Sequence, residues 1–138
     1  MLIVKPCGLS QGKGIFLTRK LKDIPRDQCH VVQQYKSMPY LINGKKFDFR
    51  IYVLVTQVVP EMQVFIYKDG LARFATENYV NNYEENLFMH LTNYAINKES
   101  EKFEGNEDEF KKTMSETLQI IEEEQGPNGP KIIEKLKE

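Results

Sequence analysis

The sequence of 138 residues has few cysteines, no long apolar run and almost no net charge. Its two cysteines, Cys7 and Cys29, lack the spacing of a zinc site or a disulfide framework, which predicts reduced thiols in a cytoplasmic protein. The longest apolar stretch, residues 51–55, has the length of a buried strand and is too short to span a bilayer. The N-terminus lacks the layout of a signal peptide, so we expect no membrane partner.

The charges are nearly balanced, with 19 Lys and Arg against 20 Asp and Glu. No block of basic residues is present, which argues against nucleic acid as a partner. His30 and His90 are too far apart in sequence to indicate a zinc site. The length and a hydrophobic content of 41% are typical of a single globular domain.

Strand signals dominate the first two-thirds of the chain. β-Branched and aromatic runs predict strands at residues 2–4, 15–18, 31–35, 46–58, 63–67 and 71–75. Asn43-Gly44 and Asp69-Gly70 are typical of tight turns between strands. The first strand starts with no leader or cap before it, so we expect a chain that begins inside a domain.

The last third is helical in pattern. Apolar residues at Phe110, Met114, Leu118 and Ile121 fit one face of a helix over residues 107–125. Residues 126–130 break that helix, and another begins at 132. We therefore predict an α+β (mixed α/β) fold, a mostly antiparallel sheet followed by C-terminal helices that pack on it.

Lys5 stands at the end of a predicted strand and is followed by a loop with three glycines, over residues 6–14. Such a loop lets backbone N–H groups approach anionic oxygens, and a lysine adds a point charge for phosphate. The spacing matches neither the Walker A motif nor the dinucleotide fingerprint. By itself the pattern favours an ordinary hairpin loop.

Residues 46–53 alternate strictly between polar and apolar. One strand face carries Lys46, Asp48 and Arg50, together with Tyr52. The other, with Phe47, Phe49, Ile51 and Val53, is predicted to enter the core. The polar face fits either a solvated sheet or a nucleotide site, in which cations meet phosphate and the carboxylate accepts from ribose or adenine.

Residues 88–94 concentrate His90, Thr92 and Asn93, with Arg73 upstream. This mixture suits hydrogen bonding to phosphates, sugar or a metal-bound ligand. Capping and turn chemistry is the alternative, and a lone histidine is more often structural than catalytic.

Six ordered segments together resemble the tubulin tyrosine ligase-like family, whose members adopt the ATP-grasp fold. They are IVKP (3–6), SQGKGI (10–15), VQQY (32–35), KFDFRIYVLVT (46–56), GLARFAT (70–76) and HLTNYAINK (90–98). The 46–56 and 71–76 segments look closest to the polyglutamylase branch. The resemblance implies an incomplete ATP-grasp domain over residues 1–138, with nucleotide-cleft strands and loops in 1–98 and a truncated helical segment in 99–138.

The resemblance also implies site residues. The ATP-binding set covers the phosphates, the adenine hinge and the base and sugar region, and comprises Lys5, Gln11, Gly12, Gly14, Gln33, Gln34, Tyr35, Lys46, Asp48, Thr92 and Asn93. The catalytic set, facing phosphate, the acyl phosphate or the amino acid, comprises Arg50, Arg73 and His90.

The activity implied by the family is ATP-dependent ligation of an amino acid, glutamate for this branch, to tubulin through an acyl phosphate. The implied partners are free glutamate and tubulin or microtubules with acidic tails, and the implied location is the cytoskeleton, including the cilium or basal body. Mg²⁺ would bridge the ATP phosphates.

The family's magnesium-binding acid and its later acid-plus-asparagine pair normally follow the helical segment, so we expect the metal ligands beyond residue 138 and none within the chain. By the same resemblance, we expect the family's upstream lysine and N-terminal subdomain to be absent from this chain. The chain is therefore predicted to be inactive alone. The alternative is a nucleotide- or tubulin-binding remnant without chemistry.

Overall fold

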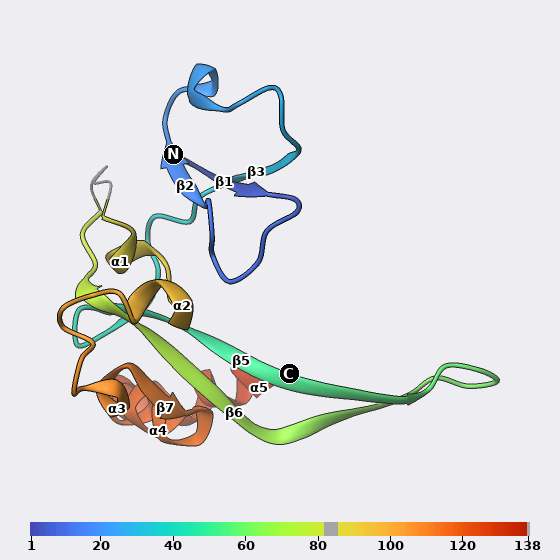
Figure 1. Ribbon diagram of the computed structural model, residues 1–138. Coiled ribbons are helices and arrows are strands. Elements are labelled where there is room, and N and C mark those ends of the chain that lie inside the picture. Colours follow the sequence, from blue (N-terminus) through green and yellow to red (C-terminus); the bar gives the residue numbers. More distant parts are fainter. Residues whose placement is uncertain (82–85, 138) are drawn as a thin grey trace. The chain divides into compact units, whose positions relative to one another are not determined.

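The computed structural model describes residues 1–81 and 86–137 and has a mixed α+β fold (Figure 1). Residue 138, the last of the predicted helical segment, lies outside the described residues. The strands are β1 (Leu2–Pro6), β2 (Phe16–Thr18), β3 (His30–Gln34), β4 (Leu41–Ile42), β5 (Lys45–Gln57), β6 (Gln63–Asn78) and β7 (Lys111–Thr113). The helices are α1 (Leu87–His90), α2 (Tyr94–Asn97), α3 (Glu107–Phe110), α4 (Met114–Gln125) and α5 (Gly129–Lys137), with 3₁₀ turns η1 (Leu21–Asp23) and η2 (Gly126–Asn128). All strand pairings given below are antiparallel, which confirms the predicted fold class.

The chain divides into two compact units. Unit 1 comprises Met1–Phe47 and Phe74–Phe110, and unit 2 comprises Asp48–Arg73 and Lys111–Glu138. The long strands β5 and β6 contribute residues to each unit. The functional layout predicted from the sequence, 1–98 and 99–138, stays a prediction.

Unit 1 contains a three-stranded sheet in the order β2-β1-β3. Leu2 faces Thr18 on one side and Gln34 on the other, which confirms the strands predicted there within one or two residues. Ile3, Leu17, Tyr35 and Leu91 pack together as a buried cluster. The central strand of this sheet, β1, carries Lys5 directly after the buried residue Val4.

The predicted turn at Asn43-Gly44 is confirmed. It joins β4 to β5 with Ile42 opposite Lys45, so the loop has two residues. Asn43 has φ 50° and Gly44 has φ 74°. Two successive residues in the left-handed region match the twist of the flanking strands, and asparagine and glycine adopt it most readily.

The predicted turn at Asp69-Gly70 is wrong, because β6 runs through it without a break. A Cβ on Gly70 would lie 2.5 Å from the carbonyl oxygen of Arg50. Glycine is needed here for the close approach of two strands and not for a change of direction. The Asp69 carboxylate accepts from the N–H of Gly70 at 2.7 Å and from that of Ser115 at 3.1 Å.

The single helix predicted over residues 107–125 is also wrong, since β7 separates α3 from α4. Ala72 of β6 pairs with Lys112 of β7. Thr113 then starts α4 with a reciprocal capping box, in which the Thr113 hydroxyl accepts from the N–H of Glu116 and the Glu116 carboxylate accepts from that of Thr113.

The second helix starts three residues earlier than predicted, at Gly129. A Cβ on this residue would collide with the carbonyl of Glu122, so the glycine lets α5 begin tightly against α4. Ile121 and Ile133 are buried, and Glu122 to Glu124 are exposed as expected for a solvated face. No helix in residues 1–81 and 86–137 has the length and apolar character that crossing a bilayer requires.

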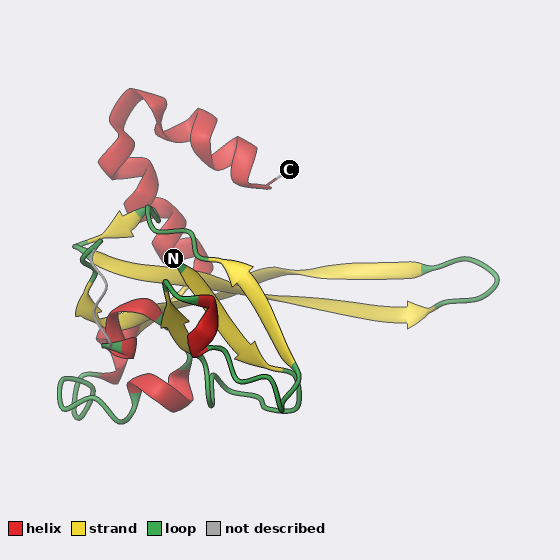
Figure 2. Cartoon of the chain, turned by 90° about the horizontal axis from the view of Figure 1, so that it is seen from above, coloured by secondary structure: helices red, strands yellow, loops and turns green. Residues whose placement is uncertain are grey.

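The distal halves of β5 and β6 form a two-stranded ribbon, visible as a long hairpin in Figure 2. Ile51 is 51% exposed and Val53 55%, so the prediction that this side of the strand enters the core is wrong for both. The flanking strands β4 and β7 are only two and three residues long and pair elsewhere on β5 and β6. Every residue of β5 from Arg50 to Thr56 is exposed, and side chains alternate between the two faces of a strand. Both faces of the ribbon therefore meet solvent.

Candidate functional site

Lys46 joins three segments of unit 1 that are far apart in sequence. Its ammonium group donates to the carbonyl of His90 at 2.7 Å and to the hydroxyl of Tyr35 at 3.2 Å. The same group lies 4.9 Å from the centroid of the Tyr35 ring, a cation–π distance. Three of the predicted site residues thus contact one another, and their role in binding a nucleotide stays a prediction.

The Tyr35 hydroxyl lies 3.0 Å from Nδ1 of His90. The rings of Tyr35 and Tyr79 both meet that of His90 edge to face, with centroids 5.4 and 5.6 Å away. Burial, followed by a hydrogen bond with Tyr79, raises the pKa of Tyr35 above its ordinary value.

His90 is only 1% exposed. In this structure its ring packs between two tyrosines, which is the structural role that the sequence left open beside a catalytic one. Thr92 is buried as well, and Asn93 follows as the residue before α2. The catalytic role of His90 stays a prediction.

Asn97 is a residue that the sequence analysis gave no role. Its side-chain oxygen accepts from the N–H and the hydroxyl of Thr76, both at 2.9 Å. Its amide group donates to the carbonyls of Leu91 at 2.8 Å and of Asn93 at 3.1 Å. Asn97 therefore ties the segment that carries His90, Thr92 and Asn93 to β6. No local pattern marks it, since its partner Thr76 lies 21 residues away.

Lys5 and Gln33 meet on the β1–β3 pair. The Lys5 ammonium donates to the Gln33 side-chain oxygen at 3.0 Å. Gln34 ends β3 with an exposed side chain, and buried Tyr35 follows. The predicted phosphate lysine and the predicted adenine hinge are thus neighbours in one sheet, joined by a hydrogen bond that solvent can reach.

The glycine loop after β1 packs against the start of α2. Gln11, Gly12 and Gly14 all have positive φ, at 62°, 87° and 69°. A Cβ on Gly12 would lie 3.0 Å from Ile96 and 3.1 Å from Asn93. Gly12 therefore has to lack a side chain for the loop to pack this closely against Asn93 and Ile96.

The remaining predicted residues belong to unit 2. Arg73 donates to Asp48 through Nε at 2.9 Å and through its terminal nitrogen at 2.6 Å, a bidentate pair. This hydrogen bonding raises the pKa of Arg73 further above its ordinary value. The side chain of Arg50 is exposed. The sequence analysis placed Asp48 in the ATP-binding set and Arg73 in the catalytic set. In the structure the two side chains form an ion pair with each other.

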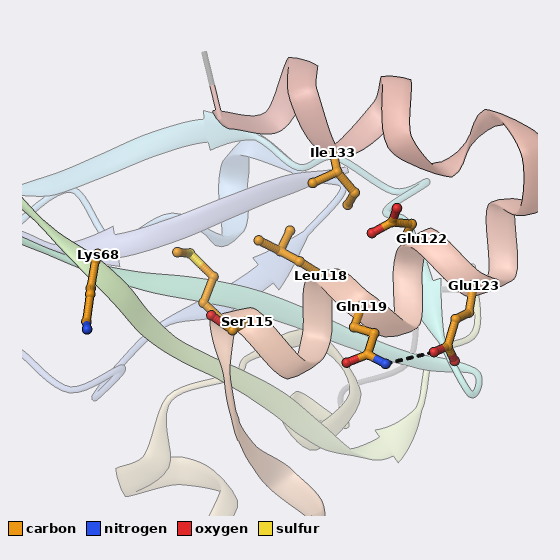
Figure 3. A pocket seen from close by; sticks show the side chains of 8 residues that line it. Lys68, Ser115, Leu118, Gln119, Glu122, Glu123 and Ile133 are labelled. Carbon is orange, nitrogen blue, oxygen red and sulfur yellow. Dashed lines mark hydrogen bonds between the residues drawn. The ribbon is translucent and has the colours of Figure 1, made fainter.

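A pocket of about 640 Å³ in unit 2 contains none of the predicted site residues (Figure 3). Leu118 and Ile133 point into the space between α4 and α5, and Gln119 donates to Glu123 at 3.0 Å on the same wall. Its lining also includes Lys68, Met114, Ser115 and Glu122. Within the described residues, no group of three or more His, Cys, Asp or Glu side chains is arranged to hold a metal ion.

Comparison with known proteins identifies the family. A model of the tubulin-tyrosine ligase family matches residues 1–138. The chain belongs to this family. It is 44% identical over 146 aligned positions to a "Probable beta-tubulin polyglutamylase" of Tetrahymena thermophila, covering 99% of this chain and 12% of that protein.

Two mouse relatives of the tubulin-tyrosine ligase family are similar over shorter ranges. Tubulin polyglutamylase TTLL13 is 53% identical over 73% of this chain and 13% of its own length. Tubulin polyglutamylase TTLL7 is 47% identical over 79% of this chain and 12% of its own length. The predicted family is confirmed, and the chain spans about an eighth of the length of these relatives.

Proposed function

We propose that this chain forms the nucleotide-binding part of an ATP-grasp ligase that attaches glutamate to tubulin. The family match over residues 1–138 and the polyglutamylase names of its relatives support this activity. The observation that carries the nucleotide role is the contact of Lys46 with Tyr35 and His90, because it joins three of the family-like segments within unit 1.

ATP fits the residues of unit 1. Lys5 carries its charge where solvent reaches it, and its ammonium group donates to the neutral side-chain amide of Gln33. The loop with positive φ at Gln11, Gly12 and Gly14 would present backbone N–H groups to phosphate oxygens. The end of β3 at Gln34 offers backbone groups for an adenine ring. Lys46 would supply a second cation.

The reaction class has two steps. An acceptor carboxylate is phosphorylated, and the amine of free glutamate then attacks the acyl phosphate, so that an amide forms and phosphate leaves. Arginines stabilise the negative charge that develops in such steps. Arg50 and Arg73 are assigned this role.

The proposed acceptor is the acidic tails of tubulin. The activity would then take place on microtubules of the cytoskeleton, cilium or basal body. Within residues 1–81 and 86–137, carboxylates are not gathered into a group that could hold Mg²⁺.

Isothermal titration of the 138-residue chain with ATP tests the nucleotide role. Lys5→Ala should weaken binding by about tenfold or more, because a phosphate loses a charged partner. Lys22→Ala is the matched control, an exposed lysine in η1 of the same unit, and should bind as the unaltered chain does. Equal affinity for Lys5→Ala and the unaltered chain, or no binding by either, contradicts the proposal.

A module that binds nucleotide or tubulin without chemistry is the second candidate. Incorporation of radiolabelled glutamate into tubulin separates the two candidates. Turnover by the 138-residue chain that is lost on Lys46→Ala establishes the ligase and rules out the module. ATP binding without turnover is expected both of the module and of a ligase part that is inactive alone.

A further inference from the structure

Cys7 and Cys29 lie directly opposite each other at the end of the β1–β3 ladder. The register pairs Lys5 with Val31 and Pro6 with His30, so the next pair along is Cys7 with Cys29. The N–H of Cys7 donates to the carbonyl of Cys29 at 3.0 Å, which extends the ladder by one step. Facing residues at such a hydrogen-bonded position have Cα atoms about 5.5 Å apart, within the range that a disulfide spans.

The two thiols also interact with each other. A hydrogen bond with the Cys29 side chain is the main cause that raises the pKa of Cys7 above its ordinary value. Both cysteines are free and exposed, so a soluble oxidant reaches them. This proximity could not be read from a spacing of 22 residues, and it changes what the two cysteines can do.

The position of the pair gives a disulfide a mechanical consequence. Cys7 is the first residue of the glycine loop after β1, and Gly8 follows it in open space. Strand alternation puts Cys7 on the same sheet face as Lys5. A covalent link at Cys7 therefore fastens the first residue of the loop to the residue that precedes β3.

We propose that Cys7 and Cys29 form a reversible intramolecular disulfide when the chain meets a hydroperoxide, and that the bond restrains the glycine loop. One thiolate attacks the peroxide oxygen and becomes a sulfenic acid, releasing water or an alcohol. The other thiol then attacks the sulfenic sulfur, the S–S bond forms and water leaves. The two thiols lose two electrons, the peroxide gains them, and a dithiol reverses the reaction.

The test is oxidation of the 138-residue chain with hydrogen peroxide, followed by thiol titration and mass spectrometry. We expect both titratable thiols to disappear, the monomer mass to fall by about 2 Da, and dithiothreitol to restore both. The bond closes a loop of roughly 20 residues, so the melting temperature should rise by about 5 °C or more. Hydrogen exchange of the loop amides should slow.

The variants Cys7→Ser and Cys29→Ser are the controls, and they should keep the reduced chain's melting temperature because both side chains are exposed. Neither should show the thermal rise or the slower exchange after peroxide. The proposal is overturned if the thiols survive, if oxidation yields only linked dimers, or if only sulfinic acid forms. None of these readouts uses a nucleotide, so they stand apart from the ligase proposal.

Discussion

The ammonium group of Lys46 lies 2.7 Å from the carbonyl oxygen of His90 and 3.2 Å from the hydroxyl of Tyr35. A lysine placed on these two oxygens and over an aromatic ring is only partly exposed to water. It also fixes the end of β3 and the end of α1 with respect to the start of β5 within unit 1. The family-like segments are therefore held together by polar contacts as well as by the apolar cluster around Ile3.

Removal of the Tyr35 hydroxyl should change how stability depends on pH. The pKa of Tyr35 is raised above 10.0 in the folded chain, so between pH 10 and that higher pKa the unfolded chain loses a proton that the folded chain keeps. The stabilising effect is complete below pH 10 and declines above it, by about 1.4 kcal/mol for each pH unit.

Urea unfolding of Tyr35→Phe across pH 8–12 measures this effect. The variant should be less stable at pH 8, since Lys46 and His90 lose a partner, and its curve should fall less steeply above pH 10. Tyr67→Phe, with an exposed side chain on β6, is the control and should keep the slope of the unaltered chain. Parallel curves for Tyr35→Phe and the unaltered chain would show that Tyr35 is not the group responsible.

Replacement of Asn97 by alanine should be among the most damaging single changes. It leaves the buried N–H and hydroxyl of Thr76 and the carbonyl of Leu91 without the partners seen here. The free energy of unfolding should drop by about 3 kcal/mol. Denaturant titration provides the measurement, with Asn106→Ala as control because its side-chain hydrogen bonds are long and exposed. A similar small loss in both variants would contradict this role for Asn97.

Alanine at Gly12 should act very differently from alanine at Gly8. Gly12 has φ 87°, and its Cβ would press on Ile96 and Asn93, whereas a Cβ on Gly8 meets nothing within 4 Å. Gly12→Ala should therefore lower both the melting temperature and the affinity for ATP, the latter by about tenfold. Gly8→Ala should leave both near the values of the unaltered chain. Differential scanning fluorimetry with and without ATP compares the two variants. Equal melting temperatures and equal ATP-induced shifts for both would contradict a role of the glycine loop in binding ATP.

The β5–β6 ribbon should make the isolated chain associate with itself. Leu54 is 61% exposed and Phe65 56%, and both line a shallow hollow on the ribbon. Exposed apolar strands with open edges are prone to pair with other chains. Leu54→Lys with Phe65→Lys should reduce association in sedimentation velocity without lowering the melting temperature.

The matched control for that pair is Leu21→Lys, a 73% exposed leucine on η1, far in sequence from the ribbon. It should leave association unchanged, since a single apolar side chain on a short turn offers no strand edge. Association that responds to Leu21→Lys, or that persists after both ribbon substitutions, would mean that the ribbon is not its source.

Local signals explain which parts of the fold the sequence predicted. The sequence predicts the turn at Asn43-Gly44 correctly because asparagine and glycine themselves favour the positive φ angles that this turn requires. Asp69-Gly70 carries a similar signal, but its glycine is required because the carbonyl oxygen of Arg50 on β5 lies too close for a Cβ atom. A glycine can form a turn or can allow another strand to approach closely. Which of the two applies depends on residues far away in sequence.

The break before α4 had a local signal that the apolar spacing hid. Thr113 and Glu116 form the Thr-x-x-Glu pattern of a capping box, which would have placed the helix start correctly. The Asp48–Arg73 pair had no such signal, because its members lie 25 residues apart and either could have met a ligand instead. The family resemblance supplied residue roles, and the contacts of Asn97 came only from the structure.

The central claim is that unit 1 binds the nucleotide, and amide chemical shifts test it most directly. In an ATP titration of the ¹⁵N-labelled 138-residue chain, the amides of residues 8–14 and 33–35 and those next to His90 should shift together in a saturable way. Amides of α5, which lines the pocket of unit 2, should stay where they are. Shifts confined to α4 and α5, or no shifts at millimolar ATP, would contradict the account.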